Sequence, residues 1–166
     1  MYEFKDRNAL AQRGAAQLET WLKARPETLE LKNVEAEPGF QAIDVDFLWY
    51  TKRKPEGYKL ELKVDNYYQT GNFFFETQSN VERGTPGCFL YTEADLLFYY
   101  FLPQGLLYVL PLPETRAWFL VELESFAARD TKTPIKDTFY TTRGRLVPRK
   151  RLMQAIPQAT CYKLLD

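Results

Sequence analysis

The sequence predicts a mixed α/β domain in which helices flank a central mixed β-sheet. Two segments, residues 8–25 and 113–129, carry apolar side chains at helical spacing, whereas several shorter segments between them alternate apolar and polar residues as half-buried strands do. The chain has 166 residues, 45% of them hydrophobic, which is enough to bury the core of one domain. We therefore expect a single domain over residues 1–166, with a basic C-terminal segment at 129–151.

The first helix is predicted over residues 8–25, because Leu18 and Leu22 fall on one face at this spacing. Asn8 is a candidate N-cap residue, and Pro26 would end the helix. An amphipathic helix of this kind is expected to pack its apolar face on the sheet.

Four strand-like segments are expected after this helix. They alternate apolar with polar residues or are rich in β-branched and aromatic residues, and they fall within 29–40, 41–50, 58–65 and 72–77. Pro38-Gly39 would turn the chain after the first, residues 51–57 form a hairpin loop, and Gly71 lies at the last junction. This order favours two or three antiparallel neighbours following the helix.

The second half of the chain is predicted to continue the sheet and add a second long helix. Glycine and proline punctuate a turn at 82–88, and residues 92–96 could open a short helix. Two apolar strands are expected on either side of the Pro-Gln-Gly turn within 96–112, followed by the helix at 113–129. The aromatic runs are interpreted as core, and residues 144–165 as short elements packed back on the sheet.

Composition excludes several classes of chemistry. The chain contains no histidine, which removes Ser-His-Asp and Cys-His mechanisms and the usual histidine metal sites. Cys88 and Cys161 are far apart, with no CxxC spacing, so we expect free buried thiols. Any metal site would then be rich in oxygen ligands, which suits magnesium or manganese. With no long apolar run and a charged N-terminus, we expect a cytoplasmic protein with no membrane partner and no nucleotide cofactor.

Charge is unevenly distributed along a chain whose net charge is zero. The segment 129–151 has a net charge of +6, so the remainder has a net charge of −6. A phosphate-binding surface and a solvated loop with scattered charges both remain open for this segment. If it binds nucleic acid, the candidate residues are Arg143, Arg145, Arg149, Lys150 and Arg151.

The strand at 58–65 carries the main candidate site. Alternation places Glu61, Lys63 and Asp65 on one face, with the neighbouring Leu and Val side chains on the other. The preceding strand contains Asp44 and Asp46, and either could face Glu61 and Lys63 across the sheet. Two carboxylates brought together repel each other unless a cation lies between them. A half-exposed strand with solvated charges is the simpler alternative.

This pattern resembles the PD-(D/E)xK nuclease superfamily, whose active site has an acidic residue at the end of one strand and Glu-x-Lys on the next. The matching residues are Asp46 and Glu61-Leu62-Lys63. The resemblance covers about residues 40–101, because the sequence after the Glu-x-Lys strand also looks like that of phage and bacterial resolvase-like proteins of this superfamily: it contains Thr70-Gly71-Asn72, Glu76 to Ser79, Gly84 to Gly87 and Ala94-Asp95.

The resemblance implies a restriction-endonuclease-like core and a metal-dependent DNA endonuclease, either structure-specific or restriction-type, that acts as a homodimer to cut both strands. Asp46 and Glu61 would hold Mg (or Mn), Lys63 would orient the attacking water, and Asp44 would lie behind them. The first helix would contribute Glu19, and the strand after Glu-x-Lys would contribute Glu76 and Gln78. For these last three, solvent-facing side chains without a role are the alternative.

Two other classes of function stay open at this point. The first is a non-catalytic nuclease-fold protein that binds nucleic acid or a protein partner. The second is a small structural or assembly protein whose polar sheet face has no chemical role. The presence of Asp46, Glu61 and Lys63 together favours the enzyme over a non-catalytic relative.

Overall fold

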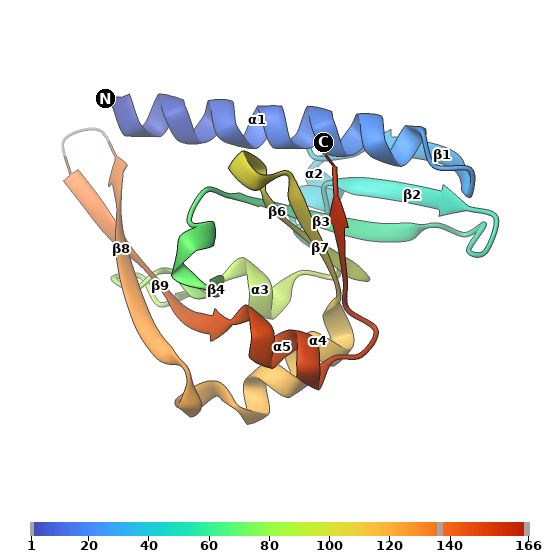
Figure 1. Ribbon diagram of the computed structural model, residues 1–166. Helices are drawn as coiled ribbons and strands as arrows, with labels where there is room; N and C mark the ends of the chain where they lie inside the picture. Colours follow the sequence, from blue (N-terminus) through green and yellow to red (C-terminus); the bar gives the residue numbers. More distant parts are fainter. Residues whose placement is uncertain (1, 136–137, 165–166) are drawn as a thin grey trace. The chain divides into compact units, whose positions relative to one another are not determined.

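The computed structural model describes residues 2–135 and 138–164, including their side chains except those of residues 2–8 and 134 (Figure 1). The fold is mixed α/β, as the sequence predicts, and the chain divides into two compact units. Unit 1 comprises Met1–Tyr68, Glu93–Leu112 and Gln158–Asp166, and unit 2 comprises Gln69–Thr92 and Pro113–Pro157. The expectation of one domain over the whole chain stays a prediction.

Unit 1 contains a six-stranded mixed sheet in the order β1-β2-β3-β6-β7-β10. Its strands are β1 (Thr28–Asn33), β2 (Phe47–Thr51), β3 (Tyr58–Asp65), β6 (Leu96–Phe101), β7 (Leu106–Pro111) and β10 (Thr160–Lys163). β3 and β6 are parallel, whereas all other neighbours are antiparallel. The predicted order of helix followed by three antiparallel strands is therefore confirmed for β1, β2 and β3.

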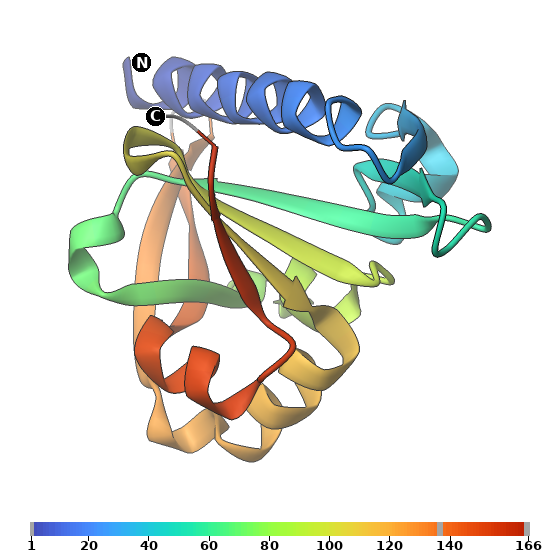
Figure 2. The ribbon, with the colours of Figure 1, turned by 45° about the vertical axis from the view of Figure 1, so that its right-hand side comes forward.

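The long helix α1 (Tyr2–Lys23) runs along this sheet (Figures 1 and 2) and buries its apolar side chains against it. The core of unit 1 lies where α1 packs on the sheet. It consists of Leu18, Leu22, Phe47, Leu60, Phe98, Tyr100, Leu102 and Leu107. The helix approaches β3 closely at Gly14, where a Cβ atom would lie 2.4 Å from Val64 Cγ2. Glycine at this position thus sets the distance between helix and sheet.

Unit 2 contains a four-stranded antiparallel sheet in the order β5-β4-β9-β8. Its elements are β4 (Asn72–Asn80), β5 (Thr85–Pro86), α3 (Cys88–Tyr91), α4 (Leu112–Val121), β8 (Ala127–Ile135), β9 (Thr138–Pro148) and α5 (Arg149–Ala155). Phe75 stacks on Phe89, with 4.1 Å between ring centroids, and Phe119 packs edge-on against both rings. Aromatic side chains therefore form the core, as predicted.

Short elements connect these strands and helices. They are α2 (Pro38–Gln41) and the 3₁₀ turns η1 (Tyr68–Thr70), η2 (Leu102–Gln104) and η3 (Leu123–Ser125). Within the described residues, no helix combines the length and the apolar character that crossing a lipid bilayer requires. The two cysteines form no disulfide, and the expectation that both are buried is wrong, because Cys161 lies exposed on the edge strand β10.

Three predicted boundaries are wrong. The helix predicted over residues 113–129 ends at Val121, and β8 begins at Ala127. Helix α1 begins at Tyr2, so Asn8 lies within it and is not its N-cap residue. Residues 41–50 do not form one strand, because α2 precedes a turn in which Asp44 has a φ of +54°, and β2 begins only at Phe47. A residue with positive φ cannot continue a strand.

The short helix predicted at residues 92–96 is absent; α3 ends at Tyr91, and β6 begins at Leu96. Hydrogen bonds hold this segment extended beside β3. The Asp95 carboxylate accepts the Lys59 N–H at 2.8 Å and lies 3.2 Å from Lys54 Nζ. These bonds to a neighbouring strand favour the extended backbone over a helical turn.

Candidate active site

Asp46 precedes β2 directly, and the end of the β2–β3 pairing determines its position. The strands pair from Phe47↔Leu60 to Trp49↔Tyr58, and the Asp46 N–H donates to the Leu60 carbonyl at 2.8 Å. Further along β3, the Leu62 N–H has no strand partner in β2. It donates instead to the Asp46 carboxylate, Oδ2, at 2.7 Å. The side chain of Asp46 thus replaces the next bond of the sheet and is fixed beside Glu61.

The alternation predicted for β3 is confirmed by its packing. Leu60 is fully buried in the core that α1 covers, and Leu62 and Val64 pack against the same core. Glu61, Lys63 and Asp65 consequently lie on the opposite face.

A pocket of about 470 Å³ lies in unit 1, and four acidic residues are among those that line it. It is bounded by α1, by the end of β1 and the residues after it, and by β3 next to Asp46. The acidic residues that line it are Glu19, Glu35, Asp46 and Glu61; the others are Ala11, Gln12, Ala15, Ala16, Asn33, Phe47, Leu62 and Val64. No basic side chain lines it among the described residues, so a cation would find only oxygen ligands of negative or neutral charge.

Burial and mutual repulsion change the protonation of these carboxyls. Burial, with smaller contributions from the charges of Glu35 and Asp44, raises the pKa of Asp46 to about 6, although hydrogen bonds with Leu62 and Glu61 act in the opposite direction. Burial also raises the pKa of Glu61 well above its usual range, with smaller contributions from Asp46 and Asp44. The positive charge of Lys63 acts in the opposite direction on Glu61. Without a cation, these carboxyls therefore hold protons more tightly than ordinary ones.

Asp44 reaches this cluster from a turn, whereas the sequence predicts that it shares a strand face with Asp46. Its carboxyl hydrogen-bonds to Glu61, and one oxygen of each group lies within 4.8 Å of the other. Glu61 Oε2 is inaccessible to solvent, and it has no hydrogen-bond partner among the residues that the structure describes. Buried carboxylate oxygens at this spacing fit a shared divalent cation.

Lys63 lies next to the pocket without lining it. Its Nζ is 5.9 Å from the centroid of the Tyr99 ring, and the Tyr99 hydroxyl donates to the Asp65 carboxylate. Lys63 is close enough to lower the pKa of Glu61 electrostatically. The Asp46, Glu61 and Lys63 side chains predicted as a set therefore lie in one part of unit 1.

The other acidic candidates are divided between the two units. Glu19 lines the pocket, with its carboxylate 2.5 Å from Lys23 Nζ one helical turn further along. Glu76 and Gln78 lie on β4 in the sheet of unit 2, whereas β3 pairs with β2 and β6. The prediction that Glu76 and Gln78 extend the polar face of β3 is therefore wrong, because the chain leaves that sheet after Asp65 and β4 belongs to the other sheet.

The predicted nucleic-acid-binding arginines lie in unit 2, where nearby oxygens hold several of them. Arg143 forms a bidentate ion pair with Asp130 at 2.7 and 2.8 Å. Arg145 donates to the Phe126 carbonyl and to Glu124, and Arg151 donates to Glu122 and Ser125. The Arg149 N–H bonds the Gly71 carbonyl, and Lys150 is exposed. Much of the positive charge is thus compensated locally, and Lys136 lies outside the described residues.

Sequence reasoning missed Glu35, Gln12 and Asn33, all of which line the pocket. Antiparallel pairing brings Glu35 towards Asp46, because Asn33 lies opposite Phe47 and the Val34 N–H donates to the Asp46 carbonyl at 2.8 Å. The residue after Val34 must then lie close to Asp46. This argument requires knowing where β1 ends, and the sequence alone does not show it.

The sequence matches no protein-family model, and comparison with curated proteins and with solved structures gives no match. Function is therefore inferred from the site itself.

Proposed function

We propose that the protein is a metal-dependent DNA endonuclease of the PD-(D/E)xK type that hydrolyses phosphodiester bonds, with its active site in unit 1. The observation that carries the proposal is the hydrogen bond from Leu62 to Asp46. It holds the Asp46 carboxylate, directly before β2, beside Glu61 of the adjacent strand β3, where Lys63 also lies. The order of α1, β1, β2 and β3 and the mixed sheet also support a restriction-endonuclease-like core.

The carboxylates of this site fit a magnesium or manganese ion. Asp46 and Glu61 would be its main ligands, and Glu19, Glu35 or Asp44 could complete the set. Buried like charges that raise each other's pKa are stabilised when a cation neutralises them. When bound, such an ion neutralises charge on the phosphate and lowers the pKa of water.

The protein's own groups supply position and charge. The Asp46 carboxylate stays fixed by the Leu62 N–H, so the direction of its second oxygen is defined. The Lys63 ammonium would hold the attacking water by hydrogen bonding and offset the negative charge that develops on the phosphate. On the α1 side, the pocket is lined by the small residues Ala11, Ala15 and Ala16, which leave room for a ligand.

A second candidate is a non-catalytic protein that binds nucleic acid. It is favoured by the position of Lys63, which does not line the pocket and lies over the Tyr99 ring. Two chains related by a twofold axis, each cutting one strand, would suit the endonuclease, whereas the binding protein requires no such pairing.

A nicking assay separates the two candidates. Purified protein is incubated with supercoiled, linear, branched and single-stranded DNA in magnesium or manganese. We expect Lys63→Ala to lower the cleavage rate about 10² to 10⁴-fold while the protein stays folded. Glu61→Gln should abolish cleavage. The matched controls are Lys52→Ala and Glu56→Gln, two exposed residues of the loop between β2 and β3.

The enzyme proposal fails if wild-type protein cleaves none of these substrates, or if Lys63→Ala cleaves as fast as wild type. Metal binding is measured separately by calorimetric titration of wild type and Asp46→Asn. Asparagine keeps an oxygen that can accept the Leu62 N–H, so the variant loses the charge with the least change to the sheet.

A further inference from the structure

The pocket between α1 and β3 is larger than a metal ion requires. A water molecule takes about 30 Å³, so an ion with a few bound waters fills less than half of the pocket, whose volume is about 470 Å³. Volumes of about 300 to 1,000 Å³ are typical of sites for organic ligands. The pocket therefore has room for part of a substrate in addition to the ion.

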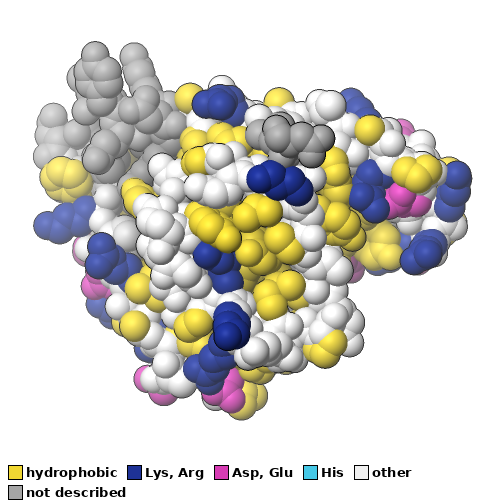
Figure 3. Space-filling model, viewed as in Figure 1, with side chains coloured by type: hydrophobic (Ala, Val, Ile, Leu, Met, Phe, Trp, Pro, Cys, Tyr) yellow, Lys and Arg dark blue, Asp and Glu magenta, His cyan; other side chains and the backbone are white. Residues whose placement is uncertain are grey.

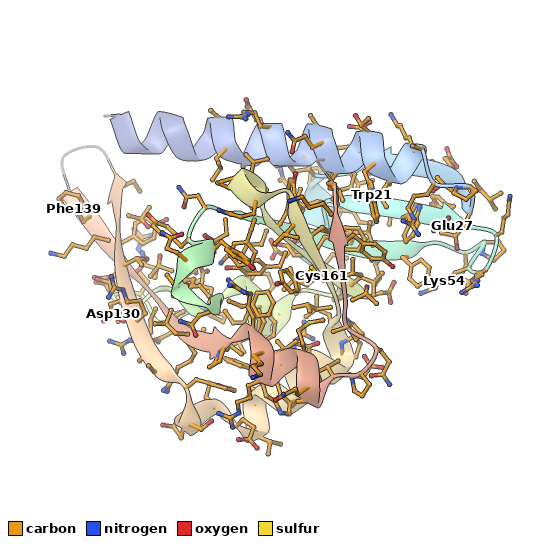
Figure 4. All side chains as sticks on the ribbon, in the orientation of Figure 1. Trp21, Glu27, Lys54, Asp130, Phe139 and Cys161 are labelled. Atoms are coloured by element: carbon orange, nitrogen blue, oxygen red, sulfur yellow. The ribbon has the colours of Figure 1, made fainter. Side chains whose placement is uncertain are left out.

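This room results from small side chains on one flank of α1. Ala11, Ala15 and Ala16 line the pocket there. By helical spacing, Trp21 lies on the opposite flank, and its ring centroid is 5.1 Å from that of Tyr162 on β10. Figure 4 shows Trp21 just below α1 and beside β10, and Figure 3 shows hydrophobic side chains on the surface below α1. Large side chains thus fill the space along one flank of α1, whereas alanines leave it open along the other.

The other walls of the pocket combine apolar surface with two amide side chains. Leu62 and Val64 of β3 are apolar, whereas Gln12 and Asn33 carry carboxamide groups. Asn33 Oδ1 accepts the Glu35 N–H at 3.1 Å, which leaves the amide nitrogen of Asn33 to donate. Gln12 is exposed and offers both donors and an acceptor. Apolar walls with two amides match the flat faces and the polar edge of a nucleobase.

The acidic residues of the pocket favour a neutral group at this place. Glu19 and Glu35 line the pocket in addition to the two expected ligands of the cation. A phosphate that is not next to the cation would be repelled by them. A base is neutral, and the amino groups of adenine, cytosine and guanine are donors that a carboxylate accepts.

The depth of the cation site excludes a paired nucleotide. Glu61 Oε2 is inaccessible to solvent, and it has no hydrogen-bond partner in the part of the chain that the structure describes. A phosphate that reaches a cation held there must enter the pocket. A double helix, whose major groove alone is about 12 Å wide, does not enter a pocket of this volume. The nucleoside attached to that phosphate must therefore leave the base stack first.

We propose that this pocket receives one unpaired nucleoside of the DNA, beside the phosphate that is cut. Leu62 and Val64 contact a face of the base. Gln12 and Asn33 hydrogen-bond its edge. The substrate is then single-stranded or branched DNA, or a duplex from which one nucleotide is extruded. The inference rests on the proposed function, because it takes DNA as the ligand and uses the proposed cation site, and it adds the class of DNA that the site accepts.

The base is tested with two small ligands that carry the same phosphate. Deoxyadenosine 5′-monophosphate and deoxyribose 5-phosphate compete with a short, fluorescein-labelled single strand for the full-length protein. The measurement uses calcium and a Lys63→Ala background, so that cleavage plays no part. The nucleotide should compete at concentrations about tenfold lower or more, because burying about 60 Å² of apolar surface gives this factor. Equal competition by both ligands shows that no base is bound and overturns the inference.

The position of the base is tested by filling the pocket in the same background. Ala16→Phe adds a ring to the lining and changes no carboxylate, so the affinity for the single strand should fall about tenfold or more. The matched control is Ala9→Phe, because Ala9 is also an exposed alanine of α1 but is not among the lining residues; this variant should bind as its parent does. Gln12→Met keeps the length of the side chain and removes its polar atoms. It should weaken binding of the nucleotide and leave that of deoxyribose 5-phosphate unchanged.

Two further outcomes overturn the inference: an unchanged single-strand affinity in Ala16→Phe, or wild type that cleaves a paired linear duplex as fast as single-stranded DNA. The second outcome leaves the endonuclease intact and removes only the unpaired substrate. Wild type that cleaves nothing has the opposite meaning if the parent protein prefers the nucleotide to deoxyribose 5-phosphate and Ala16→Phe loses this preference. That result overturns only the endonuclease and supports the nucleoside pocket.

Discussion

At the scale of single residues, the hydrogen bond between Asp46 and Leu62 links the fold to the site. Burying a carboxylate costs free energy. Here the carboxylate accepts one backbone N–H, a bond that a backbone carbonyl of a longer β2 could accept instead. The chain thus keeps a charge near other charges at a cost in stability. Such a cost is typical of a functional site.

Removing this charge should stabilise the metal-free protein. For Asp46→Asn at pH 7.5 in EDTA, we expect the free energy of unfolding to rise by about 1–3 kcal/mol, since buried like-charge repulsion disappears. Asp46→Ala should gain less, because leaving the Leu62 N–H without an acceptor costs about 1–3 kcal/mol. Urea unfolding of the three proteins measures both differences. If Asp46→Asn is less stable than wild type, Asp46 is not under repulsion.

The stability difference between wild type and Asp46→Asn should also depend on pH. The folded-state pKa of Asp46, about 6, lies above its unfolded value of 3.8, so the folded state binds the proton more tightly. This contribution to stability is fully present below pH 3.8 and is lost as the pH rises through 6, by about 3 kcal/mol in total. Urea unfolding in EDTA across this window should show wild type falling relative to the variant. A difference that stays constant with pH contradicts the prediction.

Asp46 and Glu61 could be predicted from the sequence because alternation on β3 and the preceding Asp are local patterns. Glu35 could not, because its place in the pocket depends on the register between β1 and β2. The pocket itself also depends on how closely α1 approaches β3, which no local pattern gives.

At the scale of secondary-structure elements, that approach is governed by Gly14. A methyl group there would lie 2.4 and 2.9 Å from the two Cγ atoms of Val64, closer than side chains tolerate. We expect Gly14→Ala to destabilise the protein by about 1–3 kcal/mol, although alanine is intrinsically better than glycine in a helix by about 1 kcal/mol. Thermal unfolding measures the change.

A second substitution tests this cause. Val64→Ala removes the two methyl groups that the new Cβ would meet, so the double variant should recover most of the stability relative to Val64→Ala alone. If Gly14→Ala stabilises the wild-type background, helix propensity outweighs the contact, and α1 is free to move.

The hairpins β2–β3 and β6–β7, the helix α1 and the first part of the helix predicted over 113–129 could be predicted from the sequence, because apolar spacing and Pro/Gly turns identify them within short windows. The assignment of β4 to a separate sheet could not be predicted in this way. β4 pairs with β9, about 70 residues further along the chain, and that pairing has no local signal.

At the scale of the whole molecule, zero net charge conceals opposite charges on the two units. Unit 2 contains ten basic and seven acidic residues, and unit 1 contains twelve basic and fifteen acidic residues. The acidic unit contains the pocket for a proposed cation, and the basic unit contains the residues predicted to bind nucleic acid. A bound cation would lower the repulsion between unit 1 and phosphates.

We therefore expect a divalent cation to strengthen DNA binding, as well as to support cleavage. Calcium is the suitable probe, since carboxylate oxygens bind it. Adding calcium at constant ionic strength should raise the affinity of wild type for a labelled duplex several-fold, about 1 kcal/mol for one favourable charge near the surface. The gain should be much smaller for Glu61→Gln and intact for Glu56→Gln. Equal gains in all three place the calcium effect outside the pocket.

The path of the chain between the two units also sets an order of assembly during synthesis. The chain leaves unit 1 after Tyr68, returns for β6 and β7, leaves again after Leu112, and returns once more for β10. β10 pairs with β7 and is made from residues that follow the whole of unit 2. The sheet that carries the acidic pocket is therefore completed only when the last strand has emerged from the ribosome, after every residue of the basic unit has been translated.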